Sequence, residues 1–245
     1  MDRTLFTPQL STLSDTYRTI AYDLRARTDR YEGPYNLSAL ADDLAALLDT
    51  LNVESIVLAG VSTGGFMALD FVNRYPERVR GIILINSMAA SHTETERNEY
   101  SNLAAQVRKN GPTDQLLDIG RVRMFGETTR ETNPVLVEHW VNRWRTYPGE
   151  AIYYEMQSWI GREDFTDKLS NITVPFLSIH GTEDTVLAPE RTESMLTQVP
   201  YGDQVLIEDA GHSAPIERPD PVNHAIREFL SDVSTCQIQS QFSVW

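Results

Sequence analysis

The chain has 245 residues, of which 41% are hydrophobic and 23% charged, and its formal net charge is −14. This balance is typical of a globular protein, and the excess of carboxylates argues against binding to nucleic acid or an anionic membrane. No apolar run approaches the ~20 residues of a membrane span, and the first residues lack the pattern of a signal peptide. The single cysteine, Cys236, excludes an intrachain disulfide. We therefore expect a cytoplasmic protein.

Short apolar runs of strand length alternate with helical patterns along the chain. Residues 37–51 place their leucines on one helical face, with Asn36 or Ser38 as the cap. Residues 63–75 form a second helical pattern that Pro76 stops. The other predicted elements are strands at residues 17–23, 55–60, 79–85, 173–180 and 203–208, and a helix at residues 221–230. Apolar strands separated by helices predict an α/β fold, a mostly parallel sheet covered by helices on both faces.

The alternation of strands and helices stops between residues 90 and 167. This segment is rich in charge, tryptophan and tyrosine at helical spacing. We expect it to be a helical cap inserted into a core made of residues 1–89 and 168–233. Residues 234–245 are polar with two late aromatics, Phe242 and Trp245, and we expect a tail that is loosely held or docked into a groove.

The segment from Gly60 to Gly65 reads GVSTGG and matches the G-x-S-x-G pattern between a strand and a helix. This context is typical of a nucleophile elbow, in which a serine projects from a strained turn. Ser62 is the candidate nucleophile. The small residues Gly60 and Gly64 are expected to let strand and helix approach each other. The backbone N–H of Thr63, at the helix start, is expected to stabilise an oxyanion.

A serine nucleophile needs a base, and the base needs a carboxylate that fixes its tautomer. One strand is followed by HGTED, ending at Asp184, and the next by DAGH, ending at His212. The order serine, acid, histidine is that of this elbow type, so Asp184 is the acid candidate and His212 the base candidate. Glu183 is an alternative acid, whereas Glu208 and Asp209 resemble surface carboxylates. For the other histidines we expect surface or satisfied core positions (His92, His139 and His224) or local packing at a strand end (His180).

These motifs together resemble the α/β-hydrolase family, near the 3-oxoadipate enol-lactonase and small-esterase branch. The resemblance rests on DLR at residues 23–25, GPYNLSALADDLAALLDTL at 33–51, the GVSTGG elbow, YPERV at 75–79, HGTED at 180–184 and AGHSAPIERP at 210–219. It implies that Ser62, Asp184 and His212 form the catalytic triad, and that the helical insertion shapes the substrate pocket.

Two features depart from the family pattern. By this resemblance we expect the first three strands and a His-Gly loop, which carries the second oxyanion donor, to be absent, because the segment that starts at Thr7-Pro8 resembles the helix after that loop. Losing one such donor typically lowers the rate ~10²–10³-fold. The family's third strand lies between the strands that we assign to residues 17–23 and 55–60. We therefore predict that these two strands close up, or that another segment fills the gap.

The second departure follows the DLR motif, where Ala26-Arg27-Thr28-Asp29-Arg30 replaces a glycine-containing loop. Arg25, Arg27 or Arg30 could bind an anionic substrate. The surplus of carboxylates on this chain instead favours ion pairs on the surface for these arginines.

The sequence thus predicts a serine hydrolase that cleaves a small ester or lactone through an acyl-enzyme. The alternatives are a lyase, cyclase or cofactor-free oxygenase that uses the His–Asp pair as a general base, and a ligand-binding protein with little turnover. We expect no metal and no organic cofactor, because the sequence has no ligand cluster and no phosphate loop. The expected partner is a small-molecule substrate, and a missing sheet edge would favour a homo-oligomer.

Overall fold

The computed structural model of the protein describes residues 1–241, with side chains up to residue 234. Four parallel strands form one sheet in the order β1-β2-β3-β4. Their bounds are Ile56–Val61 (β1), Val79–Ile85 (β2), Phe176–Gly181 (β3) and Gly202–Ile207 (β4). The α/β class and the strands predicted from residue 55 onward are therefore confirmed.

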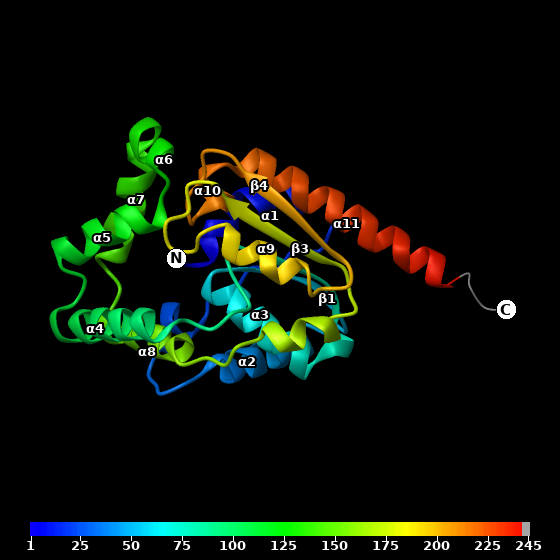
Figure 1. Ribbon diagram of the computed structural model, residues 1–245, viewed down its shortest axis with the longest axis horizontal. Coiled ribbons are helices and arrows are strands. Elements are labelled where there is room, and N and C mark those ends of the chain that lie inside the picture. The colour runs from blue at the N-terminus through cyan, green and yellow to red at the C-terminus, as the bar shows by residue number, and fades with distance from the viewer. Residues whose placement is uncertain (242–245) are drawn as a thin grey trace.

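Helices connect these strands and flank the sheet (Figure 1). The Asn36 side chain caps α2 by accepting the amide of Ala39, which settles the choice between Asn36 and Ser38. The α-helices are α1 (Thr7–Leu13), α2 (Leu37–Thr50), α3 (Thr63–Arg74), α4 (Glu94–Asn110), α5 (Asp114–Met124), α6 (Glu127–Thr132), α7 (Pro134–Trp144), α8 (Gly149–Ile160), α9 (Glu190–Leu196), α10 (Ala214–Glu217) and α11 (Pro219–Gln241). Short 3-10 turns lie at Arg3–Phe6, Arg25–Arg27, Pro76–Arg78 and Thr166–Asn171.

The central strands β2 and β3 are buried on both faces, as their apolar sequences predict. In β2, Ile82 and Leu84 pack into the core under α2 and α3, whereas Ile83 and Ile85 pack into the core under α11. Alternate residues of a strand point to opposite faces, and because both faces are buried here, β2 is apolar at almost every position. The sheet therefore holds the loops at its carboxyl edge between two layers of helices.

The helices α4–α8 lie together beside the sheet, at the side where the strands end (Figure 1). They account for the segment between β2 and β3, and no strand is found there among the described residues. Trp140, Trp144 and Phe125 of this group belong to a small apolar cluster that also includes Leu5 from the N-terminal turn. The helical character predicted for residues 90–167 is thus confirmed.

Helix α11 extends beyond its predicted end. It continues to Gln241, so residues 234–241, for which we expected a tail that is loosely held or docked into a groove, are helical. The helical period of residues 221–230 persists with Val233 buried, and no proline or glycine follows to stop it. Phe242 and Trp245 lie outside the described residues.

The predicted strand at residues 17–23 is wrong, and so is the predicted closure of the gap beside it. This segment makes no ladder, and β1 is an edge strand of the described sheet. An open slot separates the two, forming part of a cavity of about 860 Å³. Ile20 and Ala59 are exposed on its two sides. An extended segment becomes a β-strand only when a neighbouring backbone offers hydrogen-bond partners to its N–H and C=O groups. Here the backbones of residues 17–23 and of β1 are held apart.

Within residues 1–241 no helix combines the length and the apolar character that crossing a membrane requires.

Candidate active site

Ser62 lies in the tight turn between β1 and α3. Its backbone has φ 51° and ψ −114°, a strained conformation for a residue with a Cβ. Its amide donates to the carbonyl of Ile85, and its own carbonyl accepts the hydroxyl of Ser87. Contacts with the end of β2 therefore hold Ser62 in this strained conformation. Its side chain makes no capping bond to α3, and Ser62 lines the cavity.

The close approach at this turn depends on Gly60 and Gly65. A Cβ on Gly60 would lie 2.3 Å from the backbone of Gly64, and one on Gly65 would lie 2.4 Å from the hydroxyl oxygen of Ser87. A Cβ on Gly64 would meet nothing within 4 Å. The prediction that Gly64 permits the approach is therefore wrong. Gly64 borders the cavity instead, and its small size leaves that space open.

Asp184 and His212 follow the neighbouring strands β3 and β4 and are hydrogen-bonded to each other. Nδ1 of His212 lies 2.8 Å from Oδ2 of Asp184. Both residues are buried, at 3% and 5% exposure. Because the carboxyl ends of parallel strands meet at one edge of the sheet, loops that are far apart in sequence bring the two side chains together.

The carboxylate of Asp184 is held from several directions. Oδ2 also accepts the side-chain amide of Asn86, and Oδ1 accepts the backbone amides of Val186 and Leu187. Burial alone would raise the pKa of Asp184, but the charge and hydrogen bond of His212 and the other donors outweigh it and keep the pKa below its usual value. Asp184 is therefore ionised at neutral pH and orients the imidazole of His212.

Glu183, the alternative acid, points elsewhere. Its carboxylate accepts the backbone amide and the hydroxyl of Thr128 in α6, at 2.9 and 2.5 Å. Glu208 and Asp209 are exposed, as expected. The structure thus pairs His212 with Asp184 and none of these alternatives.

Ser62, Thr63 and His212 line the same cavity. No hydrogen bond joins the Ser62 hydroxyl to His212 in the part of the chain described here; such bonds often tighten only when substrate is bound. The amide of Thr63 heads α3, where the first backbone N–H groups have no partners within the helix. Three of the four predicted site residues therefore meet at one cavity, and the fourth, Asp184, is hydrogen-bonded to His212.

The model of the alpha/beta hydrolase fold family matches residues 3–219 of the chain. The protein belongs to this family. A thermophilic esterase from Thermogutta terrifontis is 33% identical in sequence, with a TM-score of 0.90 over 95% of this chain and 86% of the esterase. A 3-oxoadipate enol-lactonase of Acinetobacter baylyi is 27% identical over 95% of this chain and 85% of its own length. The enol-lactonase from Burkholderia xenovorans has a TM-score of 0.86 at 25% identity, covering 94% of this chain and 87% of its own.

The sequence analysis assigned no role to two side chains that support the site of this α/β-hydrolase. Asn86, directly after β2, donates to both Asp184 and the carbonyl of Gly211. Glu217 is buried at 6% exposure and accepts the amides that flank His212, those of Gly211 and Ser213. The only available signals were their positions, Asn86 at a strand end and Glu217 five residues after the histidine.

The remaining histidines differ from one another in their surroundings. His139 and His224 are exposed, and Nε2 of His180 lies 2.7 Å from the carbonyl oxygen of Leu187, so those expectations are confirmed. The expectation of a surface or satisfied position is wrong for His92. This side chain is 4% exposed, lines the cavity and makes no hydrogen bond within the described residues, because its neighbours are aromatic rings.

His92 is expected to make the protein less stable as the pH falls. Burial, followed by the charge of Arg162, lowers its pKa to about 4, whereas an unfolded histidine titrates near 6.5. Between these values the unfolded chain takes up a proton that the folded chain does not, so the free energy of unfolding decreases by about 3 kcal/mol by pH 4.

The His92→Phe variant lacks this titration. Urea unfolding between about pH 7 and pH 4.5 should show a stability difference between the variant and the wild type that changes with pH. If both proteins lost stability in parallel over this range, His92 would not be the group responsible.

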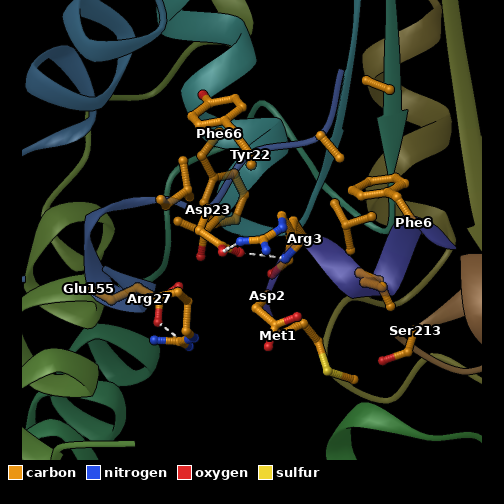
Figure 2. Close-up of a pocket in the computed structure, with 18 of the residues that line it drawn as sticks. Met1, Asp2, Arg3, Phe6, Tyr22, Asp23, Arg27, Phe66, Glu155 and Ser213 are labelled. Carbon is orange, nitrogen blue, oxygen red and sulfur yellow. Dashed lines mark hydrogen bonds and ion pairs between the residues drawn. The ribbon is translucent and has the colours of Figure 1, made fainter. Parts of the chain in front are cut away.

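The arginines near the DLR motif have mixed partners. Arg25 pairs with Asp43 at 2.6 Å, as the surplus of carboxylates predicts, whereas Arg27 pairs with Glu155 at 2.6 Å away from the surface, with side chains 8% and 16% exposed. Figure 2 shows that the Arg27–Glu155 pair faces the cavity. Arg30 is exposed and has no ion-pair partner within residues 1–241. Across the same residues, no group of three or more His, Cys, Asp or Glu side chains is arranged to hold a metal ion.

Proposed function

We propose that the protein is a serine hydrolase of small esters or lactones. The observation that carries this proposal is the 2.8 Å hydrogen bond between His212 Nδ1 and Asp184, beside the cavity that Ser62 and His212 line. Relatives described as an esterase and as enol-lactonases support the same substrate class.

In this proposal the hydroxyl oxygen of Ser62 attacks the carbonyl carbon, and Nε2 of His212 takes the hydroxyl proton. The Thr63 amide stabilises the negative charge that develops on the carbonyl oxygen. His212 then returns the proton to the leaving alkoxide, which in a lactone stays attached to the acyl chain. Water gives a proton to His212 and attacks the acyl-enzyme, and His212 returns that proton to the Ser62 oxygen as the carboxylic acid leaves. Asp184 stabilises the imidazolium throughout.

The helices α4–α8 act as a cap in this proposal and shape the pocket. Arg123, Trp144 and Trp159, from α5, α7 and α8, line the cavity that Ser62 borders. The side chains of this group would therefore select the substrate, while the loops after the strands would supply the chemistry.

An active-site fluorophosphonate probe tests the proposal. The wild-type protein is expected to be labelled on Ser62 and to hydrolyse short p-nitrophenyl esters, and the Ser62→Ala variant is expected to do neither. Absence of Ser62-dependent labelling, together with absence of hydrolysis in the folded wild type, would reject it.

Activity that survives Ser62→Ala but not His212→Ala would point to a different reaction class. One observation favours this second candidate: the His212–Asp184 pair forms without a bond to Ser62 among the described residues. Such a pair can act as a general base on its own, in a lyase, a cyclase or a cofactor-free oxygenase.

A further inference from the structure

Four rings form one wall of the cavity. This aromatic wall consists of Phe66, His92, Tyr100 and Trp159. The imidazole of His92 lies 5.2 Å from both the Tyr100 and the Trp159 ring centres and 5.9 Å from that of Phe66. Phe66 is four residues after Ser62 in α3, one helical turn further along the same side. The wall therefore begins next to the nucleophile position.

The imidazole is the buried polar group of this wall, and it lacks a partner. Its Nδ1 is inaccessible to solvent and therefore also to a ligand, whereas Nε2 is not fully buried, and neither nitrogen makes a hydrogen bond in the described part of the chain. A buried polar group without a partner is costly to the folded state. A ligand oxygen in the cavity can reach Nε2 and give the imidazole a hydrogen-bond partner, which favours ligands that carry such an oxygen.

His92 cannot readily turn toward solvent, because the backbone on both sides of it is fixed. The amide of Ser91 donates to Asp164 at 2.8 Å. Thr93 caps α4 in a reciprocal capping box with Glu96. With the backbone fixed and the ring packed against Phe66, Tyr100 and Trp159 at 4% exposure, the imidazole loses little conformational entropy when it binds a ligand.

We propose that His92 hydrogen-bonds an uncharged oxygen of the substrate, a carbonyl or a hydroxyl, while the adjoining carbon skeleton lies against Phe66 and Trp159. The inference rests on the proposed function, since it describes which esters or lactones reach Ser62. His92 is uncharged at neutral pH because burial lowers its pKa to about 4. It therefore suits an uncharged group better than a carboxylate.

A carboxylate-bearing substrate would use a different residue of the cavity. Arg123 also lines it, with its guanidinium carbon 5.9 Å from the Tyr100 ring centre. This arginine has no carboxylate partner within residues 1–241. It is only partly buried and keeps solvent as a partner, whereas the His92 side chain is 4% exposed. The two residues thus predict different substrates, and an experiment can separate them.

The test compares matched esters. p-Nitrophenyl levulinate carries a ketone that p-nitrophenyl valerate lacks, and the acetate of a keto alcohol is matched by that of the plain alcohol. The His92→Phe variant keeps a ring in the wall and removes the hydrogen bond. We expect it to lower kcat/KM about 3- to 10-fold for a keto ester but not for its plain partner, and His92→Gln to restore part of the loss.

Binding is measured in parallel by calorimetry in the Ser62→Ala background, where chemistry is removed. His92→Phe is expected to weaken binding of the keto ester there by a similar factor. Equal effects on both members of each pair, or a preference for p-nitrophenyl hydrogen succinate that is lost in Arg123→Gln, would overturn the inference. If no ester is cleaved and Ser62 is not labelled, the proposed function fails, and the calorimetric comparison still decides the role of His92.

Discussion

Replacing Asp184 with asparagine is expected to lower kcat for ester hydrolysis about 10⁴-fold, because it puts the imidazole of His212 in the wrong tautomer. In the wild type the carboxylate accepts from His212 and Asn86 through Oδ2 and from two backbone amides through Oδ1. An asparagine would keep an oxygen toward those amides and turn its NH₂ toward His212. Nδ1 would then be the acceptor, and Nε2, carrying the proton, could not take another from Ser62.

The neighbouring carboxylate provides the matched control. Glu183 bonds to Thr128 and not to His212, so Glu183→Gln is expected to retain most of the activity. Steady-state hydrolysis of a p-nitrophenyl ester measures both variants, and thermal unfolding verifies that each is folded. A folded Asp184→Asn protein with nearly normal kcat would contradict the assignment of Asp184 as the acid, most directly if Glu183→Gln were the inactive variant.

The sequence was sufficient to predict the parts of the fold that depend on local pattern. β2 is apolar at nearly every position because it is buried on both faces, and this run was visible without a structure. Asp184 and His212 could be paired in advance because both follow strands of one parallel sheet, whose carboxyl ends must share an edge.

The sequence was insufficient wherever the structure or surroundings of a residue depend on segments that are distant along the chain. Residues 17–23 have a strand-like pattern, but they form no strand because β1 is not within reach. Gly64 and Gly65 are adjacent, and the sequence pattern does not distinguish them. Only a Cβ on Gly65 would clash, because the hydroxyl of Ser87 lies against that position. For His92 the sequence predicted a surface or satisfied core position, but three rings from separate segments, Phe66, Tyr100 and Trp159, enclose it.

Glu217 depends on such distant contacts more than any other residue near the site. Its Oε1 accepts the amides of Gly211 and Ser213 at 3.0 Å, one on each side of His212, and its Oε2 accepts the amide of Gly126, just before α6, at 2.8 Å. Burial raises its pKa, although these donors oppose the shift. One carboxylate thus fixes the loop that carries His212 and joins that loop to the α4–α8 group.

The Glu217→Ala variant is expected to lose about 3–5 kcal/mol of unfolding free energy, because three buried amides lose their acceptor and each unsatisfied group costs about 1–3 kcal/mol. Below its melting temperature its kcat is expected to fall about 10- to 100-fold, since a small displacement of the base misaligns proton transfer. Glu217→Gln keeps one acceptor oxygen for Gly211 and Ser213, so it should recover most of kcat while losing the bond to Gly126.

Urea unfolding and hydrolysis kinetics measure these effects, with Glu228→Ala as the control. Glu228 is an exposed carboxylate on α11 whose partner, His224, is also exposed, so its removal should change stability by no more than about 0.5 kcal/mol. If glutamine restored stability but not kcat, Glu217 would act on the reaction through its contact with α6. If alanine changed neither quantity, the loop around His212 would hold its position without this carboxylate, and the role assigned to Glu217 would be wrong.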